Sequence, residues 1–381
     1  MDRPPKILLL GDYSRCHSTL ATGLRNLGCN VTLMSGALSW ADSEPDIDIS
    51  RQPGKLGGML LSAKLRMPTV RNAMRGNDIV AIHDPIFLLL RSRRLYPYFD
   101  RLIRDNGSVF LTAMSYDIAF LDMLEAPDSP LRYSEWFVDG KPSRFFLEDP
   151  SQWEKWHNRE LMDYENHVFS KIDGAVSVLY EYHLGMERRL GKEKAGYGGI
   201  PIDTSRFEPV ALSDRPEKVR LFLGRDRNRK LEKGSDYLEI AAKRVVERYP
   251  DRAELVIVEN RPYGEFVELL KSAHVVLDQI YSYTPATTAL MAMAYGLNVV
   301  SGGEPEYYDF IGEHENRPII NAPLEPDALE ATLTDVVLHP ELIAERGRRS
   351  REFVVRHNDT NIVARRFLDF WTRRLAEKTF R

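Results

Sequence analysis

The stretch that decides the fold spans residues 273–310 and reads AHVVLDQIYSYTPATTALMAMAYGLNVVSGGEPEYYDF. Residues 274–277 form a short, β-branched apolar run, which is typical of a buried parallel strand. Strong helix formers follow over 286–295, and a second apolar run at 298–301 ends in a double-glycine turn. The order of strand, loop, helix, strand and turn predicts a βαβ unit, whose ligand site lies at the strand ends.

The start of the predicted helix carries its own signals. Pro285 suits the first helical turn, where its missing N–H costs nothing, and Thr284 is the expected N-cap. The unpaired N–H groups and the dipole at such a helix start favour an anion. An anionic ligand is therefore expected beside residues 284–288.

Length and composition indicate a two-domain globular protein. A chain of 381 residues is too long for one ordinary core, and its net charge of -4 does not favour nucleic acid as a partner. No apolar window reaches the length of a membrane span, and the first apolar run is too short for a signal peptide. Cys16 and Cys29 bracket one predicted helix, too far apart to bridge, so we expect reduced thiols and a cytoplasmic location.

The N-terminal half opens as a doubly wound α/β domain. Residues 6–10 and 30–34 read as strands and 18–27 as the helix between them. A dinucleotide fingerprint requires G-x-G-x-x-G after the first strand, and only Gly11 is present. No nicotinamide or flavin cofactor is therefore expected.

Polar side chains follow two further strands of this half. Asp117 follows the strand predicted at 108–113, at the place where polar groups line the ligand crevice of open α/β sheets. Residues 116–152 then form a long irregular loop rich in aromatic side chains, either functional or an ordered surface excursion. One long helix is predicted over 153–169, and the chain end from 346 onwards is predicted to be helical.

A basic loop opens the second half. The strand predicted at 219–223 ends in Gly224 and Arg225, and Lys230 and Lys233 precede a helix start at Ser235. A glycine turn after a strand, with several cations beside a helix start, is a typical anion site. The alternative is a solvated basic loop without a ligand.

Several of these segments resemble GT-B glycosyltransferases, notably glycosyltransferase family 4. MAMAYGLNVVSGGEPE, residues 291–306, resembles the block E-A-M-A-x-G-x-P-V-V…G-G-x-P-E, and residues 198–209 resemble the hinge N-G-[IV]-D…F-x-P. The resemblance implies two Rossmann-like doubly wound domains that face a cleft. We place an acceptor-side domain at 1–205, a nucleotide-sugar-side domain at 206–355, and a last helix at 356–381 that crosses back to the first domain.

The resemblance also implies an activity. It predicts a metal-independent glycosyltransferase that moves a sugar from a nucleotide-sugar donor to a cell-envelope or polysaccharide acceptor, either a glycan or lipid-linked. The nucleotide sugar is a substrate, and no cofactor is implied. The predicted catalytic residues are Asp117 and Glu306. The residues predicted to bind the donor are Gly11, Ser14, Arg225, Lys230, Lys233, Glu259, Tyr283, Thr284, Thr287 and Thr288.

Two positions depart from the family pattern. Retaining family 4 enzymes carry two glutamates eight positions apart, and this chain has Tyr283 and Met291 there. Methionine cannot bind a ribose diol, and a tyrosine hydroxyl substitutes for a carboxylate only in part. Two alternatives therefore stay open: a GT-B-shaped binding protein without turnover, and another nucleotide-sugar enzyme of this fold, such as an epimerase.

Residues 51–75 are basic and carry no acidic side chain. Leu56, Met59, Leu60 and Met67 recur there at helical spacing, until Pro68 interrupts the helix. A basic amphipathic helix is typical of a membrane surface, which would place the protein peripherally on the inner face of the membrane. The alternative is a helix that packs its apolar side on the core and exposes a solvated basic face.

Overall fold

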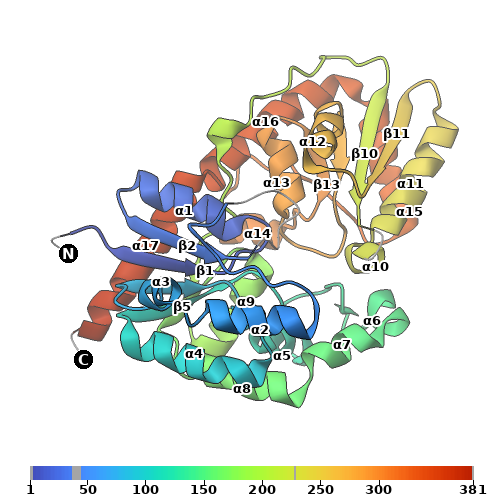
Figure 1. Cartoon of the computed structure of the whole chain (residues 1–381). Helices are drawn as coiled ribbons and strands as arrows, with labels where there is room; N and C mark the ends of the chain where they lie inside the picture. The colour runs from blue at the N-terminus through green and yellow to red at the C-terminus, as the bar shows by residue number, and fades with distance from the viewer. Residues whose placement is uncertain (1–2, 37–43, 227–228, 380–381) are drawn as a thin grey trace. The chain divides into compact units, whose positions relative to one another are not determined.

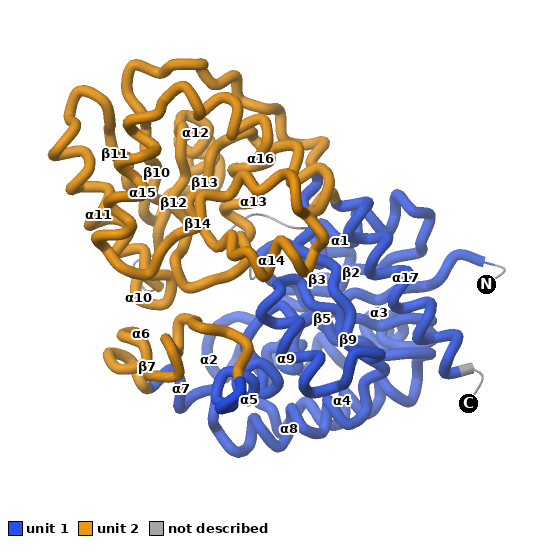
Figure 2. Tube along the Cα trace, turned by 180° about the vertical axis from the view of Figure 1, so that it is seen from behind, with its two compact units in different colours: residues 1–128, 151–203, 360–381 blue, residues 129–150, 204–359 orange. Residues whose placement is uncertain are grey.

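A computed structural model describes residues 3–36, 44–226 and 229–379. The chain divides into two compact units, shown in Figure 2. Unit 1 contains residues 1–128, 151–203 and 360–381, and unit 2 contains residues 129–150 and 204–359. Residues 129–150, part of the long aromatic loop predicted at 116–152, thus belong to unit 2 and are called the excursion below.

Unit 1 is built on a seven-stranded sheet of parallel strands in the order β3-β2-β1-β4-β5-β8-β9. Its elements are β1 (Lys6–Leu10), α1 (Cys16–Asn26), β2 (Asn30–Ser35), β3 (Ile47–Asp48), α2 (Gly54–Lys64), α3 (Pro68–Ala73), β4 (Ile79–Ile82), α4 (Ser92–Asp105), β5 (Ser108–Ala113), α5 (Ile118–Glu125), α7 (Pro150–Trp156), α8 (Arg159–Phe169), β8 (Gly174–Ser177), α9 (Tyr180–Leu190), β9 (Ala195–Tyr197) and α17 (Thr360–Thr379).

Unit 2 is built on a five-stranded parallel sheet in the order β11-β10-β12-β13-β14. Its elements are β6 (Phe137–Val138), β7 (Lys141–Pro142), α6 (Arg144–Glu148), β10 (Val219–Arg225), α10 (Lys230–Lys233), α11 (Ser235–Arg248), β11 (Ala253–Glu259), α12 (Tyr263–Lys271), β12 (Val275–Leu277), α13 (Thr287–Ala294), β13 (Asn298–Ser301), α14 (Pro305–Phe310), β14 (Ile320–Asn321), α15 (Pro326–Leu338) and α16 (Ile343–His357).

Alternation along the strands buries both faces of each sheet. In β10, Leu221 and Leu223 enter a core shared with Leu238 of α11 and Leu333 of α15. Phe222 points the other way, and its ring lies 5.5 Å from that of Phe266 in α12. Figure 1 shows α11 and α15 on one side of this sheet and α12, α13 and α16 on the other. The predicted doubly wound architecture is confirmed for both units.

The last helix packs on unit 1. A Cβ atom at Gly198 would lie 2.0 Å from the ring of Phe367, so only glycine lets α17 approach the end of β9. Thr360 Oγ1 donates to the carbonyl of Thr19 in α1 at 2.8 Å. Gly198 therefore has a packing reason in this chain.

Three predicted helices differ from those observed. Residues 153–169 form two helices instead of one, because the Asn158 side chain accepts from Leu161 N and starts α8 anew. Residues 346–381 likewise divide into α16 and α17, with a break at residues 358–359. The central helix α13 begins at Thr287, and its N-cap is Ala286 rather than Thr284. Thr284 is buried there, and its carbonyl accepts from Ser282 Oγ at 2.6 Å.

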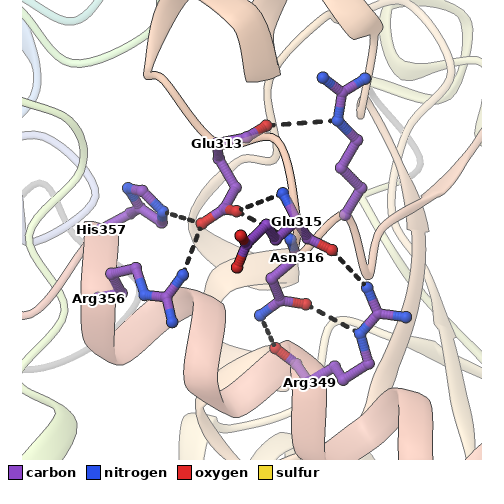
Figure 3. A network of polar contacts seen from close by, with 7 residues as sticks. Glu313, Glu315, Asn316, Arg349, Arg356 and His357 are labelled. Atoms are coloured by element: carbon purple, nitrogen blue, oxygen red, sulfur yellow. Dashed lines mark hydrogen bonds and ion pairs between the residues drawn. The ribbon is translucent and has the colours of Figure 1, made fainter.

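A buried carboxylate joins the end of α14 to α16 (Figure 3). Glu313 receives hydrogen bonds from the backbone N of Asn316 at 2.8 Å, and His357 Nε2 and Arg356 Nη1 lie 2.8 and 3.1 Å from its Oε2. Burial alone would raise the pKa of Glu313, but these partners outweigh it and lower the pKa to about 2. The network holds α14, which borders the site described next.

Candidate functional site

The strand order of unit 2 has its switch point between β10 and β12. The chain leaves these neighbouring strands toward opposite sides of the sheet, and open α/β sheets bind ligands at such a switch point. The two connecting loops pack together there, because Ile280 N donates to the carbonyl of Lys233 at 3.0 Å. Lys233 Nζ lies 3.6 Å from Asp278 Oδ1, so one predicted donor-binding cation is placed directly at the switch point.

Arg225 ends β10 and is held by two carboxylates. Its guanidinium forms ion pairs with Glu259 at the end of β11 and with Glu239 of α11. Burial alone would lower the pKa of Arg225, but these two acids raise it above its ordinary value. The predicted pair Arg225 and Glu259 therefore lies together. Glu239, which the sequence did not single out, is its third member.

The N-terminus of α13 faces the same edge of the sheet. No side chain caps this helix among the described residues, and its first hydrogen bond runs from Leu290 N to the carbonyl of Ala286. The N–H groups of the first turn are thus open to a ligand. Thr287 and Thr288 lie in that turn and are only partly buried. This is the chemical environment that favours a phosphate group.

Tyr283 and Met291, at the two positions where family 4 carries glutamates, are both buried. Tyr283 is 1% exposed, its hydroxyl accepts from Arg132 N at 2.7 Å, and its ring lies 4.8 Å from that of Tyr133. Met291 lies in the middle of α13, where its Sδ accepts from Tyr263 Oη of α12 at 3.7 Å. Tyr283 therefore contacts the excursion, not open space.

Glu304 connects the excursion to the start of α14. Its carboxylate, 7% exposed, accepts from Arg132 Nη2 at 2.5 Å, Tyr133 Oη at 2.7 Å and Asn321 Nδ2 at 2.8 Å. Burial alone would raise the pKa of Glu304, but these three partners lower it. The predicted catalytic Glu306 is more exposed and lies 3.1 Å from the same arginine. Sequence reasoning missed Arg132, because no local pattern sets it apart within the excursion.

Glu304→Gln should loosen residues 129–150. The substitution removes the charge that Arg132 and Tyr133 approach, and a hydrogen bond to a charged group is worth about 1.5–3 kcal/mol. We expect a drop of about that size in the free energy of unfolding in urea, with faster proteolysis within 129–150. Glu306→Gln is the matched control, because its half-exposed ion pair is worth about 1 kcal/mol at most. Equal effects of the two substitutions would contradict the anchoring role.

In unit 1 the loop after β1 contains the predicted ligand residues Gly11 and Ser14. Gly11 has a φ of 82°, and a Cβ atom there would lie 1.8 Å from His83 Nδ1, so only glycine fits. Ser14 and Arg15 also adopt positive φ angles, 51° and 63°. Such strain in non-glycine residues is found at functional sites. Asp12 holds the loop by accepting from His17 N at 2.9 Å.

Asp117, the other predicted catalytic residue, is the N-cap of α5. Its side chain is 2% exposed and accepts from Phe120 N at 3.0 Å. Burial, with a smaller contribution from Asp84, raises its pKa to about 7. Glu165 of α8 accepts from Ile118 N at 2.7 Å, and burial beside Asp117 raises its pKa to about 9. The strand end therefore carries a group of buried, protonatable carboxyls.

The described residues contain no group of three or more histidine, cysteine or acidic side chains arranged to hold a metal ion. Within residues 3–36, 44–226 and 229–379, no helix combines the length and apolar character needed to cross a bilayer.

No family model and no curated protein sequence matches this chain. Solved structures do. Sucrose-phosphate synthase from Thermosynechococcus elongatus aligns over 98% of this chain and 100% of its own, with a TM-score of 0.61 and 14% identity. Anabaena HepE in complex with UDP and glucose aligns over 97% and 99%, with a TM-score of 0.58 and 13% identity. MnaA from S. aureus, solved with UDP, aligns over 96% and 95%, with a TM-score of 0.52 and 10% identity.

These likenesses extend over nearly the whole chain at very low identity, so they concern the fold. They agree with the two parallel, doubly wound sheets described above. The chain has the GT-B fold.

Proposed function

We propose that this protein is a glycosyltransferase that transfers a sugar from a nucleotide-sugar donor to a glycan or lipid-linked acceptor. One observation carries the proposal: the β10/β12 switch point of unit 2 is followed on one strand by Lys233, which lies near Asp278, and on the other by the N-terminus of α13, for which no side-chain cap is seen among the described residues. A helix start beside a lysine suits a diphosphate. Two structures of similar fold, HepE and MnaA, contain UDP.

In this proposal the diphosphate lies on the first turn of α13. Backbone N–H groups of that turn and the hydroxyls of Thr287 and Thr288 bind its oxygens, while buried Thr284 shapes the turn. Lys233 and exposed Lys230 supply positive charge as the diphosphate leaves. These side-chain cations take the place of a metal ion, and the nucleotide sugar is a substrate that requires no cofactor.

Arg225 and Glu259 take a second part of the donor. Arg225 is already paired with Glu259 and Glu239, so these carboxylates balance its positive charge. The group as a whole therefore does not attract an incoming diphosphate. We therefore assign the pair to the nucleoside side, where Glu259 accepts from hydroxyl groups and Arg225 holds it in place. This is a different role for Arg225 from the one that the family resemblance implies.

The reacting sugar needs groups beyond the diphosphate site. Glu306, half-exposed at the start of α14, is proposed to contact the donor sugar. Buried Tyr283 is proposed to support this contact indirectly, because its hydroxyl accepts from the backbone of Arg132, the ion-pair partner of Glu306. In unit 1, Gly11 and Ser14 are proposed ligand contacts, and Asp117 is the proposed base, because a pKa near 7 suits proton transfer. Asp117 must become accessible for this, since it is buried in the described structure.

The two buried departures from family 4 favour a second candidate. Tyr283 is covered by Arg132 and Tyr133, and Met291 cannot bind a ribose diol. A GT-B protein that binds a nucleotide sugar without turnover would tolerate both. Family 4 membership with a re-routed donor site remains the first proposal, because the cations and the helix start are retained.

We also propose that the acceptor meets the protein at a membrane, through residues 51–75, on the cytoplasmic face. A lipid-linked acceptor would require such contact. The exposed basic side chains of this segment support it.

A panel of nucleotide sugars tests the proposal. Isothermal calorimetry measures UDP and other nucleoside diphosphates, and product analysis measures hydrolysis and transfer with and without acceptor glycans. Transfer or slow donor hydrolysis is the expected result. Binding of a nucleotide sugar without any turnover would favour the second candidate, and failure of every nucleotide to bind would refute both.

A further inference from the structure

The helix α2 exposes its apolar side chains instead of burying them. Leu56 and Met59 are each 67% exposed and Leu60 is 57% exposed. The side that packs on the core consists of Gly57, Gly58 and Leu61. The sequence left open that this helix packs its apolar side on the core. For Leu56, Met59 and Leu60 that alternative is wrong, because all three are exposed.

The exposed apolar stripe continues toward a basic pocket. Residues 56, 59, 60, 63 and 67 follow helical spacing, and Met67, at the start of α3, is half-exposed. Directly beside it, a pocket of about 360 Å³ opens where α2, α3 and α4 meet. Its lining is Leu65, Arg66, Arg71, Pro97, Tyr98 and Arg101.

The arginines of this pocket are available to a ligand. In the part of the chain that the structure describes, Arg66, Arg71 and Arg101 form no ion pair, and all three are exposed. Among the described residues, about half of the other arginines form ion pairs, such as Arg225 with two acids. Residues 51–77 also contain no aspartate or glutamate that could serve these cations. Three unpaired guanidinium groups around one pocket match an anion such as phosphate.

We propose that this surface binds an anionic phospholipid: the phosphate head group enters the Arg66–Arg71–Arg101 pocket while Leu56, Met59 and Leu60 enter the acyl boundary. The inference deepens the proposed function, on which it rests, by naming the lipid chemistry that brings the protein to its acceptor. Charge complementarity selects an anionic head group, and the exposed stripe selects a lipid over a free phosphate, because a soluble anion leaves those side chains in water.

Vesicle flotation tests the proposal. The full-length protein is mixed with phosphatidylglycerol or phosphatidylcholine vesicles at low and high salt. We expect binding to phosphatidylglycerol only, weakened by salt. Each cation near an anionic surface is worth about fivefold in partitioning, so R66S/R71S should weaken binding about 25-fold. The matched control K192S/R252S removes two exposed cations elsewhere and should have little effect.

Two further arms separate the possible sources of the anion. L56S/M59S/L60S should also weaken binding to phosphatidylglycerol, because its apolar insertion is lost. Calorimetry with inorganic phosphate should show at most weak binding. The proposal is overturned if the protein ignores phosphatidylglycerol at low salt, if the control variant loses as much binding as R66S/R71S, or if free phosphate binds the pocket while the apolar substitutions change nothing.

The same preparations are titrated with UDP, which separates this proposal from the proposed function. Loss of vesicle binding with UDP affinity intact would refute only the membrane surface. Absence of UDP binding with vesicle binding intact would refute only the transferase.

Discussion

Lys233→Met should reduce the rate of sugar transfer by about 100-fold or more, with the fold intact. The lysine lies near Asp278 at the β10/β12 switch point, where the proposal places the leaving diphosphate and its developing negative charge. Removing one pre-placed group that stabilises such charge typically costs about 100- to 1000-fold in rate. The loss is deepened because the carboxyl group of Asp278, 3.6 Å away, then has no lysine between it and the diphosphate.

Lys243→Met is the matched control for this prediction. Lys243 lies on α11, where it pairs with Glu239 at 2.7 Å, and more than half of its side chain is exposed. It should leave the rate nearly unchanged. Lys233→Arg should retain part of the activity, because the positive charge stays. A Lys233→Met enzyme that transfers sugar at the wild-type rate would remove the lysine from the mechanism.

Glu165→Gln should flatten the dependence of stability on pH between about 4.5 and 9. The pKa of Glu165 is raised by burial from 4.5 to about 9, so the folded protein holds a proton that the unfolded chain has released. A raised pKa gives stability that is complete below the unfolded value and is lost as the pH rises toward the folded value. One such group contributes a slope of about 1.4 kcal/mol per pH unit. Asp117, raised to about 7, acts in the same direction at lower pH.

Urea unfolding at pH 5, 7 and 9 measures this effect. The wild-type protein should lose stability steadily toward pH 9, and Glu165→Gln should lose less, because glutamine stays neutral and still accepts from Ile118 N. Asp163→Asn is the control on the same helix, since Asp163 is largely exposed. Parallel pH curves for Glu165→Gln and the wild-type protein would show that Glu165 is ionised in the fold.

The fold could be predicted from local patterns because its strands are short, buried and parallel. The runs at 6–10, 108–113 and 298–301 coincide with β1, β5 and β13. Each segment is apolar on both faces or carries a clear stop signal. The helix break at residues 157–158 was missed, because it depends on the side-chain cap of Asn158, which the periodicity does not contain.

The site was predictable only where it follows from strand ends. Arg225 is the last residue of β10, Lys233 lies in α10 and Asp117 follows β5, as their positions in the chain suggest. The acidic partners of these residues come from other segments of the chain. Glu239 of α11 forms an ion pair with Arg225, and Glu165 of α8 accepts from Ile118 N, next to Asp117. Arg132 reaches Glu304 across 172 positions of sequence, which no local reading could show.

The orientation of α2 is a further feature that could not be predicted from the sequence. The apolar stripe of Leu56, Met59 and Leu60 was visible in the sequence, but its direction was not. The face opposite the stripe carries Gly57 and Gly58, which pack against the turn that precedes α2: a Cβ atom at Gly57 would lie 1.7 Å from the carbonyl oxygen of Gln52. On α2 the two glycines are buried, whereas Leu56, Met59 and Leu60 are exposed. This is the reverse of the usual preference of large apolar side chains for the core.

A crystal structure with bound UDP tests the central claim most directly. We predict that the diphosphate lies at the β10/β12 switch point, with its oxygens at about 3 Å from the N–H groups of the first turn of α13 and from Lys233 Nζ. The nucleoside should then lie beside Glu259. UDP bound away from α13 and Lys233, or no binding at millimolar concentration, would contradict the account.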